Sequence, residues 1–237
     1  MNTIKNKIVS IDIALIKFYG IPKRNERTPD AVTTLIGTIL SQNTNDKNSY
    51  KAYLNLTKNY PNWETVADLP LSMIEMEIRT AGLTKQKAKA IKGALNGIKQ
   101  EQNRISLDYL TEMDNKAAIK KLTAFDGVGV KTASCVLLFS LSRNVCPVDT
   151  HVNRTLNKIG VVTSSNPEKT FWTIFYDIPE NTAHSFHTNL IRLGREFCRP
   201  SKLYCGNCPV RNICKFEDKT QNILEHRDNS FLLLDSL

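Results

Sequence analysis

The chain has 237 residues, of which 32 are Lys or Arg and 23 are Asp or Glu, giving a formal net charge of +9. A chain of this length buries a substantial core, either as one domain or as two small ones. No stretch resembles a signal peptide, and no run approaches the roughly eighteen apolar residues of a membrane span, so we expect an intracellular protein without a membrane partner.

The positive charge is concentrated in the first 216 residues. Residues 217–237 hold five acidic and two basic groups, which leaves 30 basic and 18 acidic groups, a net charge of +12, on residues 1–216. Neutralising phosphates releases condensed counterions and supplies affinity that does not depend on base sequence, so the simplest partner is nucleic acid. A solvated basic surface without such a partner is the alternative.

Apolar residues recur at helical spacing in successive segments of the chain. In "TPDAVTTLIGTILS" they predict a helix, with Thr28 placed to cap it and Pro29 suited to its first turn. Further helical segments are predicted around 47–58, 62–68, 71–79, 85–99 and 115–124. Alternation with a period of two, which would indicate strands, is not sustained, so the sequence predicts an all-α fold.

The segment "FDGVGVKTA", residues 125–133, predicts a tight hairpin between two helices, the second beginning near Lys131. Glycines let two backbones approach closely, and the N–H groups at the start of the second helix can meet a phosphate without reading a base. Nucleotide-binding loops fit poorly. A P-loop has Lys directly after its second Gly, whereas Val130 intervenes here, and a dinucleotide fingerprint needs a third Gly and a preceding strand.

Asp149 lies in "CPVDTHVNRTL", directly before another helical segment. Its simplest role is to cap that helix, which stabilises the helix by roughly 1 kcal/mol. A capping carboxylate can also face a cleft, so the same position is compatible with catalysis.

Four cysteines stand close together near the C-terminus, in the spacing C-x6-C-x2-C-x5-C: Cys198, Cys205, Cys208 and Cys214. In a reducing compartment, clustered cysteines are more often metal ligands than disulfides. Structural zinc commonly takes two short knuckles joined by a longer loop, whereas a cubane iron–sulfur cluster takes one Cys at each of four corners. The spacing favours the cluster and leaves zinc open, while Cys135 and Cys146 are expected to be buried or incidental.

Together these motifs resemble the endonuclease III family of DNA glycosylases, in the helix-hairpin-helix superfamily with a Gly/Pro-rich loop followed by an Asp. The matching stretches are "LSQNTND" at 40–46, "AGLTKQKAKAI" at 81–91, "FDGVGVKTA" at 125–133, "VDTHV" at 148–152 and the cysteine loop at 198–214. They span about residues 5 to 215, and their combination is specific although no single motif is.

The resemblance implies a bilobal all-α fold, with a six-helix barrel lobe and an iron–sulfur cluster lobe. Residues 23–136 would form the barrel lobe with its helix-hairpin-helix, residues 1–22 and 137–216 the cluster lobe, and residues 217–237 a C-terminal tail. It also implies a 4Fe-4S cluster on the four cysteines, and double-stranded DNA containing damaged bases or abasic sites as the partner. We expect the protein to be a monomer, located at the nucleoid if its source is prokaryotic.

The resemblance assigns roles residue by residue. Lys131 matches the family's catalytic lysine, and Asp149 matches its catalytic aspartate. Gln42 matches the side chain that enters the gap left by a flipped base, and Leu83 resembles the wedge on the opposite strand. The other residues expected to contact DNA are Gly127, Val128, Gly129, Val130 and Thr132 in the hairpin and Lys202 in the cysteine loop.

The implied function is base excision repair by a glycosylase for oxidised pyrimidines that is also an AP lyase, cleaving the strand by β-elimination through a lysine Schiff base. An adenine glycosylase of the same superfamily is the nearest alternative, but that class needs a carboxylate where Gly37 stands and normally lacks the lysine. A non-catalytic, metal-stabilised binder of DNA is the alternative from another class. In the tail, we expect the apolar run Phe231 to Leu234 to pack on the body or to bind a partner.

Overall fold

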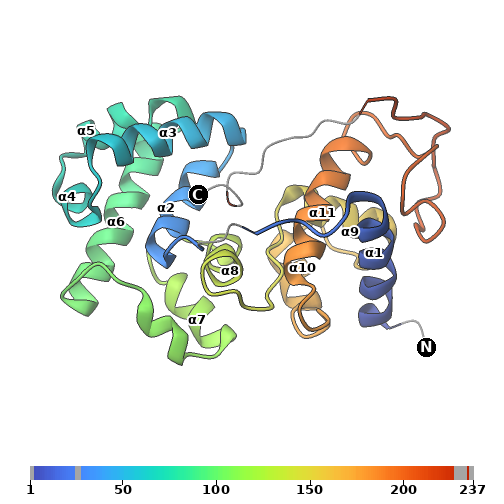
Figure 1. Cartoon of the computed structure of the whole chain (residues 1–237), viewed down its shortest axis with the longest axis horizontal. Helices are drawn as coiled ribbons and strands as arrows, with labels where there is room; N and C mark the ends of the chain where they lie inside the picture. Colours follow the sequence, from blue (N-terminus) through green and yellow to red (C-terminus); the bar gives the residue numbers. More distant parts are fainter. Residues whose placement is uncertain (1–2, 25–27, 227–233, 235–237) are drawn as a thin grey trace. The chain divides into compact units, whose positions relative to one another are not determined.

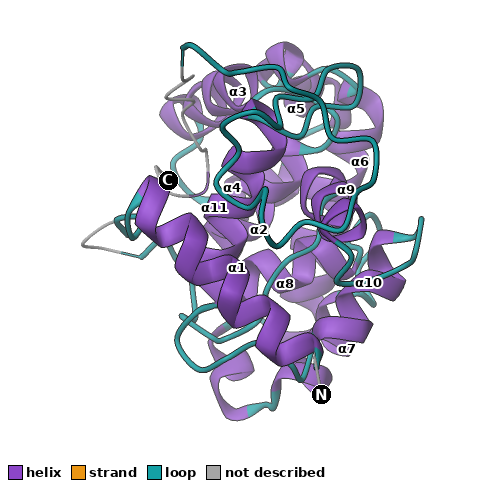
Figure 2. Ribbon diagram, turned by 90° about the vertical axis from the view of Figure 1, so that its right-hand side faces the viewer, coloured by secondary structure: helices purple, strands orange, loops and turns teal. Residues whose placement is uncertain are grey.

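The structure is a computed structural model that describes residues 3–24, 28–226 and 234. Within these residues every regular element is a helix, and loops join the helices (Figure 2). An isolated bridge pairs Cys198 with Leu203 without extending into a strand. The all-α prediction is therefore confirmed. None of the described helices is long and apolar enough to cross a membrane.

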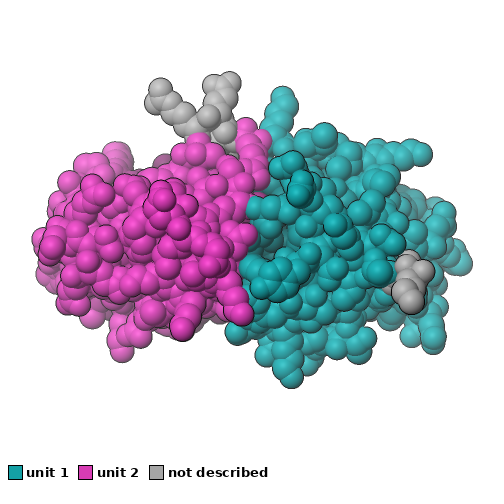
Figure 3. Space-filling view, turned by 90° about the horizontal axis from the view of Figure 1, so that it is seen from below, with its two compact units in different colours: residues 1–23, 144–230 teal, residues 24–143, 231–237 magenta. Residues whose placement is uncertain are grey.

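The chain divides into two compact units, which Figure 3 shows in different colours. The first unit consists of residues 1–23 and 144–230 and the second of residues 24–143 and 231–237, each over its described part. We expected the division after residue 136, which lies inside the helix Val130–Phe139. The observed division follows Arg143 instead, because this helix packs along the helix Ala31–Ser41 and stays whole in the second unit.

In its described residues up to Arg143, the second unit carries the helices α2 to α8 and the short 3-10 helices η1 and η2 (Figure 1). In chain order they are α2 (Ala31–Ser41), α3 (Asp46–Asn59), α4 (Trp63–Asp68), α5 (Leu71–Glu77), η1 (Arg79–Ala81), α6 (Thr84–Gln102), η2 (Asp108–Glu112), α7 (Asn115–Leu122) and α8 (Val130–Phe139). Helix α2 is the centre of this unit, because residues 31–40 are all buried and the helix packs against α3, α6 and α8. A helix buried on every side is positioned by its neighbours, so the residues that follow it are also placed by the core.

The start of α2 differs from the predicted start. Thr28 is not the cap; Asp30 is, and its Oδ1 accepts hydrogen bonds from the N–H groups of Val32 and Thr33, both at 2.9 Å. The prediction of Thr28 is wrong because one carboxylate oxygen at Asp30 satisfies two of the N–H groups that a helix start leaves without partners.

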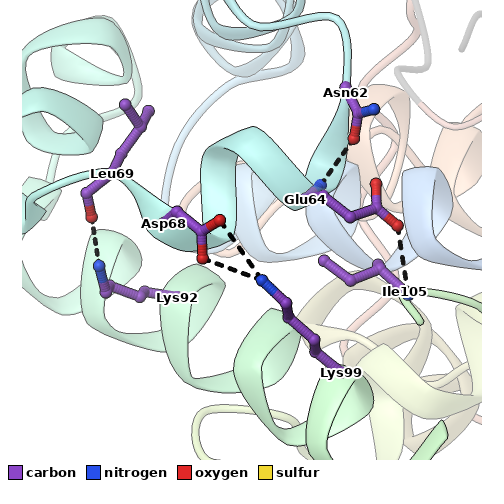
Figure 4. Close-up of polar contacts among 7 residues, drawn as sticks. All are labelled: Asn62, Glu64, Asp68, Leu69, Lys92, Lys99 and Ile105. Carbon is purple, nitrogen blue, oxygen red and sulfur yellow. Dashed lines mark hydrogen bonds and ion pairs between the residues drawn. The ribbon is translucent and has the colours of Figure 1, made fainter. Parts of the chain in front are cut away.

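Lysines of α6 hold the C-terminal end of the short helix α4 (Figure 4). The carbonyl of Leu69, which follows the last residue of α4, accepts a hydrogen bond from the ammonium group of Lys92. Lys99 forms an ion pair with Asp68, with 3.0 Å between Nζ and Oδ1. Cations at a helix C-terminus offset the partial negative charge of its last carbonyl groups, so α6 supplies to α4 the positive charge that the last turn of α4 lacks.

The first unit carries α1 (Ile4–Tyr19), α9 (Thr150–Ile159), α10 (Pro167–Ile174) and α11 (Ala183–Glu196) (Figure 1). Helix α11 is its centre, because nearly all of its residues are buried and it packs against α1 and α9. The cysteine loop, residues 198–214, begins where α11 ends, and the N–H of Cys198 donates to the carbonyl of Leu193 at 2.9 Å. The buried helix α11 therefore fixes the position at which the cysteine loop starts.

Candidate functional site

The predicted hairpin is present between α7 and α8 in the second unit. Its turn is closed by a hydrogen bond of 3.1 Å from the N–H of Val128 to the carbonyl of Phe125. Gly127 has a φ of +79°, and a Cβ built on it would lie 2.5 Å from the Cβ of Ala90 in α6. Only glycine satisfies both conditions without a shift of the backbone, so the close packing of the hairpin on α6 depends on Gly127.

Helix α8 begins at Val130, one residue before the predicted Lys131, and Gly129 is its N-cap. Gly129 has no side chain, and α8 has no side-chain cap hydrogen bond at this end. The first N–H groups of α8 carry the partial positive charge of the helix N-terminus. Lys131 lies in this first turn and is half-buried, so it stands at the electropositive end of the helix.

Two of the hairpin residues expected to contact DNA have buried side chains. Val128 is 5% exposed and Thr132 is 3% exposed. The side chain of Val128 packs inward and its N–H is engaged in the turn, whereas Gly127 and Gly129 are exposed. Any contact of this hairpin with a large anion therefore uses the backbone at the glycines and at the start of α8.

Gln42, the predicted gap-filling residue, directly follows α2 and lies against the hairpin. Its Nε2 donates to the carbonyl of Gly127 and to the hydroxyl of Thr132, each at 3.4 Å. Helices α2 and α8 pack together, which brings these residues into contact across 85 and 90 positions of sequence. The structure thus joins Gln42, the hairpin and the first turns of α8 in one cluster.

Leu83, the predicted wedge, lies between η1 and α6 with its side chain 51% exposed. Its φ of +47° and ψ of +39° place it in the left-handed region, where a non-glycine residue is uncommon. The preceding Gly82 also has a positive φ, +67°. Two successive positive φ values make a sharp bend that presents the leucine to solvent, and an exposed apolar residue there is available to contact a ligand.

Sequence reasoning missed Lys87, a residue of α6 that is 2% exposed. Its Nζ donates to the carbonyl of Leu40 at 2.7 Å and to the carbonyl of Ala81 at 2.8 Å. Burial lowers the pKa of Lys87 to about 8. A signal for it exists in the sequence, because Lys87 occupies the same helical stripe as Ile91 and Ile98, which are fully buried.

Asp149 is the N-cap of α9 in the first unit, as predicted. Its Oδ1 accepts a hydrogen bond from the N–H of Val152 at 2.7 Å, and the side chain is half-buried. His151, two residues on, has its pKa lowered by burial, while the nearby carboxylate of Asp149 acts in the opposite direction. Asp149 is therefore a fixed anionic group whose orientation is set by the helix that it caps.

The cysteine loop is held by hydrogen bonds whose acceptors are its backbone carbonyl groups. Arg154 of α9 donates from Nε to the carbonyl of Cys198 at 2.9 Å. Arg211 donates from one guanidinium nitrogen to the carbonyls of Cys205 and Thr220, at 2.7 and 3.0 Å. The N–H of Cys214 donates to the carbonyl of Val210 at 2.9 Å. The loop thus has a defined backbone although few of its side chains belong to an apolar core.

The four cysteines of this loop line one cavity together with apolar side chains, including Leu193, Phe197, Leu203, Val210 and Phe216. Burial raises the pKa of Cys198 and raises that of Cys208 to about 12, and neighbouring thiols of the loop, Cys205 and Cys214 in both cases, add to the rise. Thiolates are the ligands of iron–sulfur clusters, so the donor set and its shared cavity fit such a group. The fit is one of donor type and shared cavity alone, because among the described side chains no three His, Cys, Asp or Glu residues form a group placed to hold a metal ion.

Lys202 is exposed on the same loop, and its Nζ lies 5.2 Å from the centroid of the Tyr204 ring. The guanidinium carbon of Arg199 lies 5.4 Å from the same centroid. Both cations are within the range of a cation–π contact, and such a contact restricts the positions of the two side chains. Two positive charges therefore gather around one aromatic ring on the surface of the first unit.

Part of the predicted tail belongs to the cysteine loop. Thr220 and Asn222 both donate from their side chains to the carbonyl of Leu203, at 2.8 and 3.0 Å. The N–H of Gly206 donates to the carbonyl of Asn222 at 2.8 Å. Residues 220–222 thus hold the loop in place. The apolar run expected to pack or to bind a partner begins with Phe231 to Leu233, which lie outside the described residues.

The fold and the hairpin define the class of this protein, an all-helical helix-hairpin-helix protein. A family model described as "HhH-GPD superfamily base excision DNA repair protein" matches residues 36–174, more than half of the chain. The match includes the hairpin, Gln42, Lys131 and Asp149, and it ends before the cysteine loop.

Individual proteins give the same result. Endonuclease III of Thermotoga maritima is 30% identical over 194 residues, which cover 81% of this chain and 86% of the relative. A protein of Arabidopsis thaliana that carries the name of a DNA glycosylase is 34% identical over 193 residues, covering 81% of this chain but only 63% of that longer protein. The fold matches the structure of a non-covalent endonuclease III–DNA complex with a TM-score of 0.75 and 24% identity, over 89% of this chain and 95% of the other. The chain belongs to the HhH-GPD superfamily and is a base excision DNA glycosylase of the endonuclease III type.

Proposed function

We propose that the protein is a bifunctional DNA glycosylase and AP lyase that excises oxidised pyrimidines from double-stranded DNA, with Lys131 as the nucleophile. The observation that carries the proposal is the position of Lys131 in the first turn of α8, directly after a tight glycine hairpin and without a side-chain cap on the helix. An amine there adjoins a place where a DNA phosphate can be bound. Binding at the hairpin would therefore bring a sugar of the same strand towards the amine.

The hairpin supplies DNA contacts of the kind that do not depend on base sequence. Asp126, Gly127 and Gly129 are exposed in it, and the N–H groups at the start of α8 follow the second glycine. Backbone N–H groups at a helix N-terminus bind phosphate because they donate hydrogen bonds and carry partial positive charge. Such contacts fix the position of the protein on the duplex, which leaves recognition of the damaged base to other groups.

The proposed reaction begins when the damaged nucleotide has been flipped out of the stack. The neutral amine of Lys131 attacks C1′ of the sugar, the bond from C1′ to the base breaks, and the base leaves with the bonding electron pair and takes up a proton. The attached nitrogen loses a proton, and the sugar ring then opens: the nitrogen lone pair forms the C1′=N bond of a protonated Schiff base, the C1′–O4′ bond breaks, and O4′ takes up a proton. A proton acceptor then removes a proton from C2′. The electron pair of that C–H bond forms a C2′=C3′ double bond, and the 3′ phosphate leaves by β-elimination.

Asp149 is proposed to assist this reaction as an anionic group. Its carboxylate is held by the N–H of Val152, so its orientation is fixed before DNA binds. A fixed carboxylate stabilises positive charge that develops on a sugar when a base leaves, and it can accept a proton in the later steps. The capping role and the catalytic role are compatible, because in the cap Oδ1 accepts one hydrogen bond, from the N–H of Val152, and the carboxylate keeps its negative charge.

The four cysteines are proposed to hold a 4Fe-4S cluster with a structural role. Cys198, Cys205, Cys208 and Cys214 line one cavity, and thiolates are the ligands that such clusters take. A cluster there would cross-link a loop that contains few core residues. The cross-link would fix the loop that carries Lys202 and Arg199, and these two cations are proposed to contact DNA phosphates.

Borohydride trapping tests the proposal directly. The substrate is a duplex with a single abasic site, and the proteins are the natural chain, Lys131→Ala, and Lys116→Ala as an exposed lysine of the same unit. We expect a covalent protein–DNA adduct with the natural protein and with Lys116→Ala, and none with Lys131→Ala. Absence of an adduct from all three folded proteins would remove the lyase mechanism. A panel of duplexes containing oxidised pyrimidines, 8-oxoguanine, or adenine opposite 8-oxoguanine then tests the proposed substrate class.

A further inference from the structure

One ammonium group connects the two segments that carry the predicted DNA-inserting residues. Nζ of Lys87 donates to the carbonyl of Leu40 and to that of Ala81, at 2.7 and 2.8 Å. Leu40 stands two residues before Gln42, and Ala81 stands two residues before Leu83. Nζ of Lys87 thus binds the carbonyl group two residues before Gln42 and the carbonyl group two residues before Leu83.

Both carbonyls lie at the C-terminal ends of helices, where the intrahelical pattern leaves acceptors without partners. Leu40 is in the last turn of α2, which contains no basic residue of its own. Ala81 is the last residue of η1. A cation at such an end satisfies the carbonyl and offsets the negative end of the helix dipole. Lys87 therefore acts as the C-terminal cap of two helices at once, from a third helix.

The chain bends sharply just after each of these carbonyls. Asn43, next to Gln42, has a φ of +51°, and Leu83 has a φ of +47°. Non-glycine residues in this region are strained and persist where the surrounding structure holds them. The bonds from Lys87 fix the point from which each bend starts, so they also fix the direction in which Gln42 and Leu83 leave their helices.

If position 87 served only to fill the core, an apolar side chain would stabilise the fold more than a buried ammonium group does. Lys87 is 2% exposed and shares its stripe on α6 with Ile91, Leu95 and Ile98, each fully buried. Among the described residues, no acidic side chain forms an ion pair with Lys87. Burial of an ammonium group without a carboxylate is unfavourable, which agrees with the lowered pKa of Lys87. A methionine would fill the same space without this cost but could not bind either carbonyl.

We propose that Lys87 is a positioning residue for nucleotide flipping, which sets the spacing between the Gln42 segment (residues 41–44) and the Leu83 segment (residues 82–84). The inference rests on the proposed function, in which Gln42 fills the gap left by the flipped base and Leu83 enters the opposite strand. Two side chains that enter one duplex together must keep a fixed separation, or one of them enters without the other. Lys87 supplies that fixed separation through bonds to both segments.

The first test uses the free protein and does not depend on activity. Amide hydrogen exchange is compared for the natural chain, Lys87→Met, Lys87→Arg, and Ile98→Ala, a control on the same buried stripe of α6. We expect both segments to exchange about tenfold faster in Lys87→Met, because the bonds that hold them are lost, and to remain protected in the control. Faster exchange in only one segment, or equal effects of Lys87→Met and Ile98→Ala, overturns the proposal.

The second test measures flipping. Single-turnover excision is followed with an oxidised pyrimidine placed either in a fully paired duplex or in an unpaired bubble, where unstacking is already complete. We expect Lys87→Met to be slowed about tenfold or more on the paired duplex and less than about threefold on the bubble, since only the paired duplex requires flipping. Lys87→Arg, which keeps N–H donors, restores excision. Equal slowing on both substrates overturns a positioning role.

A double-mutant cycle ties the effect to the two side chains. Gln42→Ala and Leu83→Ala are each measured in the natural background and in the Lys87→Met background. If Lys87 acts through both residues, each substitution costs less in the second background. If each substitution slows excision by the same factor in both backgrounds, the effects are additive and the proposal is overturned. If the natural protein excises no base and forms no adduct, the proposed function fails, while the exchange experiment still decides whether Lys87 couples the two segments.

Discussion

Nε2 of Gln42 lies 3.4 Å from the hydroxyl of Thr132, so the residue that directly follows α2 contacts the first turn of α8. Thr132 is itself buried and directly follows Lys131. The predicted gap-filling residue and the predicted nucleophile are therefore positioned by the same pair of packed helices. This arrangement gives each of them a defined place relative to the hairpin before any DNA is bound.

The first prediction concerns Gln42. Gln42→Ala should slow single-turnover excision from a paired duplex about tenfold, because the gap left by a flipped base would lack a side chain that keeps it open. Its two hydrogen bonds are long, at 3.4 Å each, so the free energy of unfolding should change by less than about 1 kcal/mol. Gln100→Ala, at an exposed position of α6, is the control. Unchanged excision by Gln42→Ala would assign the gap-filling role elsewhere.

The second prediction separates the two glycines of the hairpin. Gly127→Ala should lower the free energy of unfolding by about 2 kcal/mol or more, because it combines a φ of +79° with a Cβ contact of 2.5 Å to Ala90. Gly129→Ala should change the free energy of unfolding by less than about 1 kcal/mol, because Gly129 has a negative φ and a Cβ added to it would meet open space. Urea denaturation of both variants measures the difference. Equal destabilisation would contradict the close packing of Gly127 on α6.

The third prediction concerns the basic surface of the cysteine loop. Lys202→Glu should weaken binding to undamaged duplex DNA and should lower the slope of log affinity against log salt by about one, the value for one lost phosphate contact. The reference is Lys169→Glu, an exposed lysine of α10 with the same change in net charge. If the two variants bind with the same affinity and slope, Lys202 contributes only to the overall charge of the protein.

The fourth prediction concerns the metal content. Protein purified without oxygen should contain about four irons and four sulfides per chain, the content of one 4Fe-4S cluster. Cys208→Ala should lose this content, whereas Cys135→Ala, at a buried cysteine of α8, should keep it. One zinc and no iron in the natural protein would establish the other group that the cysteine spacing permits.

The fifth prediction follows from the lowered pKa of Lys87, about 8 against 10.5 for the free side chain. Between these values the unfolded chain binds more protons at this group than the folded chain does, so stability rises with pH across this window. Burial of the charged Lys87 destabilises the folded chain by about 3 kcal/mol at most. This destabilisation is constant below the folded pKa and disappears as the pH rises to the unfolded pKa. Comparing the natural protein with Lys87→Met by denaturation from pH 7 to pH 10 isolates it from other titrating groups. Parallel stability curves for the two proteins would show that Lys87 titrates normally.

Local sequence patterns were sufficient for several features. Helical spacing predicts α2 to α7, the two glycines predict the hairpin within residues 125–133, and the prediction that Asp149 caps the next helix is confirmed, whereas α10 and α11 are not among the predicted segments. Each of these depends on residues within one or two turns of the chain. The error at Thr28 has the same local origin, since the observed cap, Asp30, lies two residues further on and accepts hydrogen bonds from two N–H groups.

The sequence by itself determined the family of this protein, its all-helical class and the chemical groups available to it, because these depend on residue types and their spacing. Tertiary structure alone decided which groups meet. It placed Gln42 against Thr132, turned Val128 inward, wrapped residues 220–222 over the cysteine loop, and brought Lys87 between Leu40 and Ala81. These contacts join segments far apart in the chain, and the packing of buried helices, which no local pattern encodes, sets their distances.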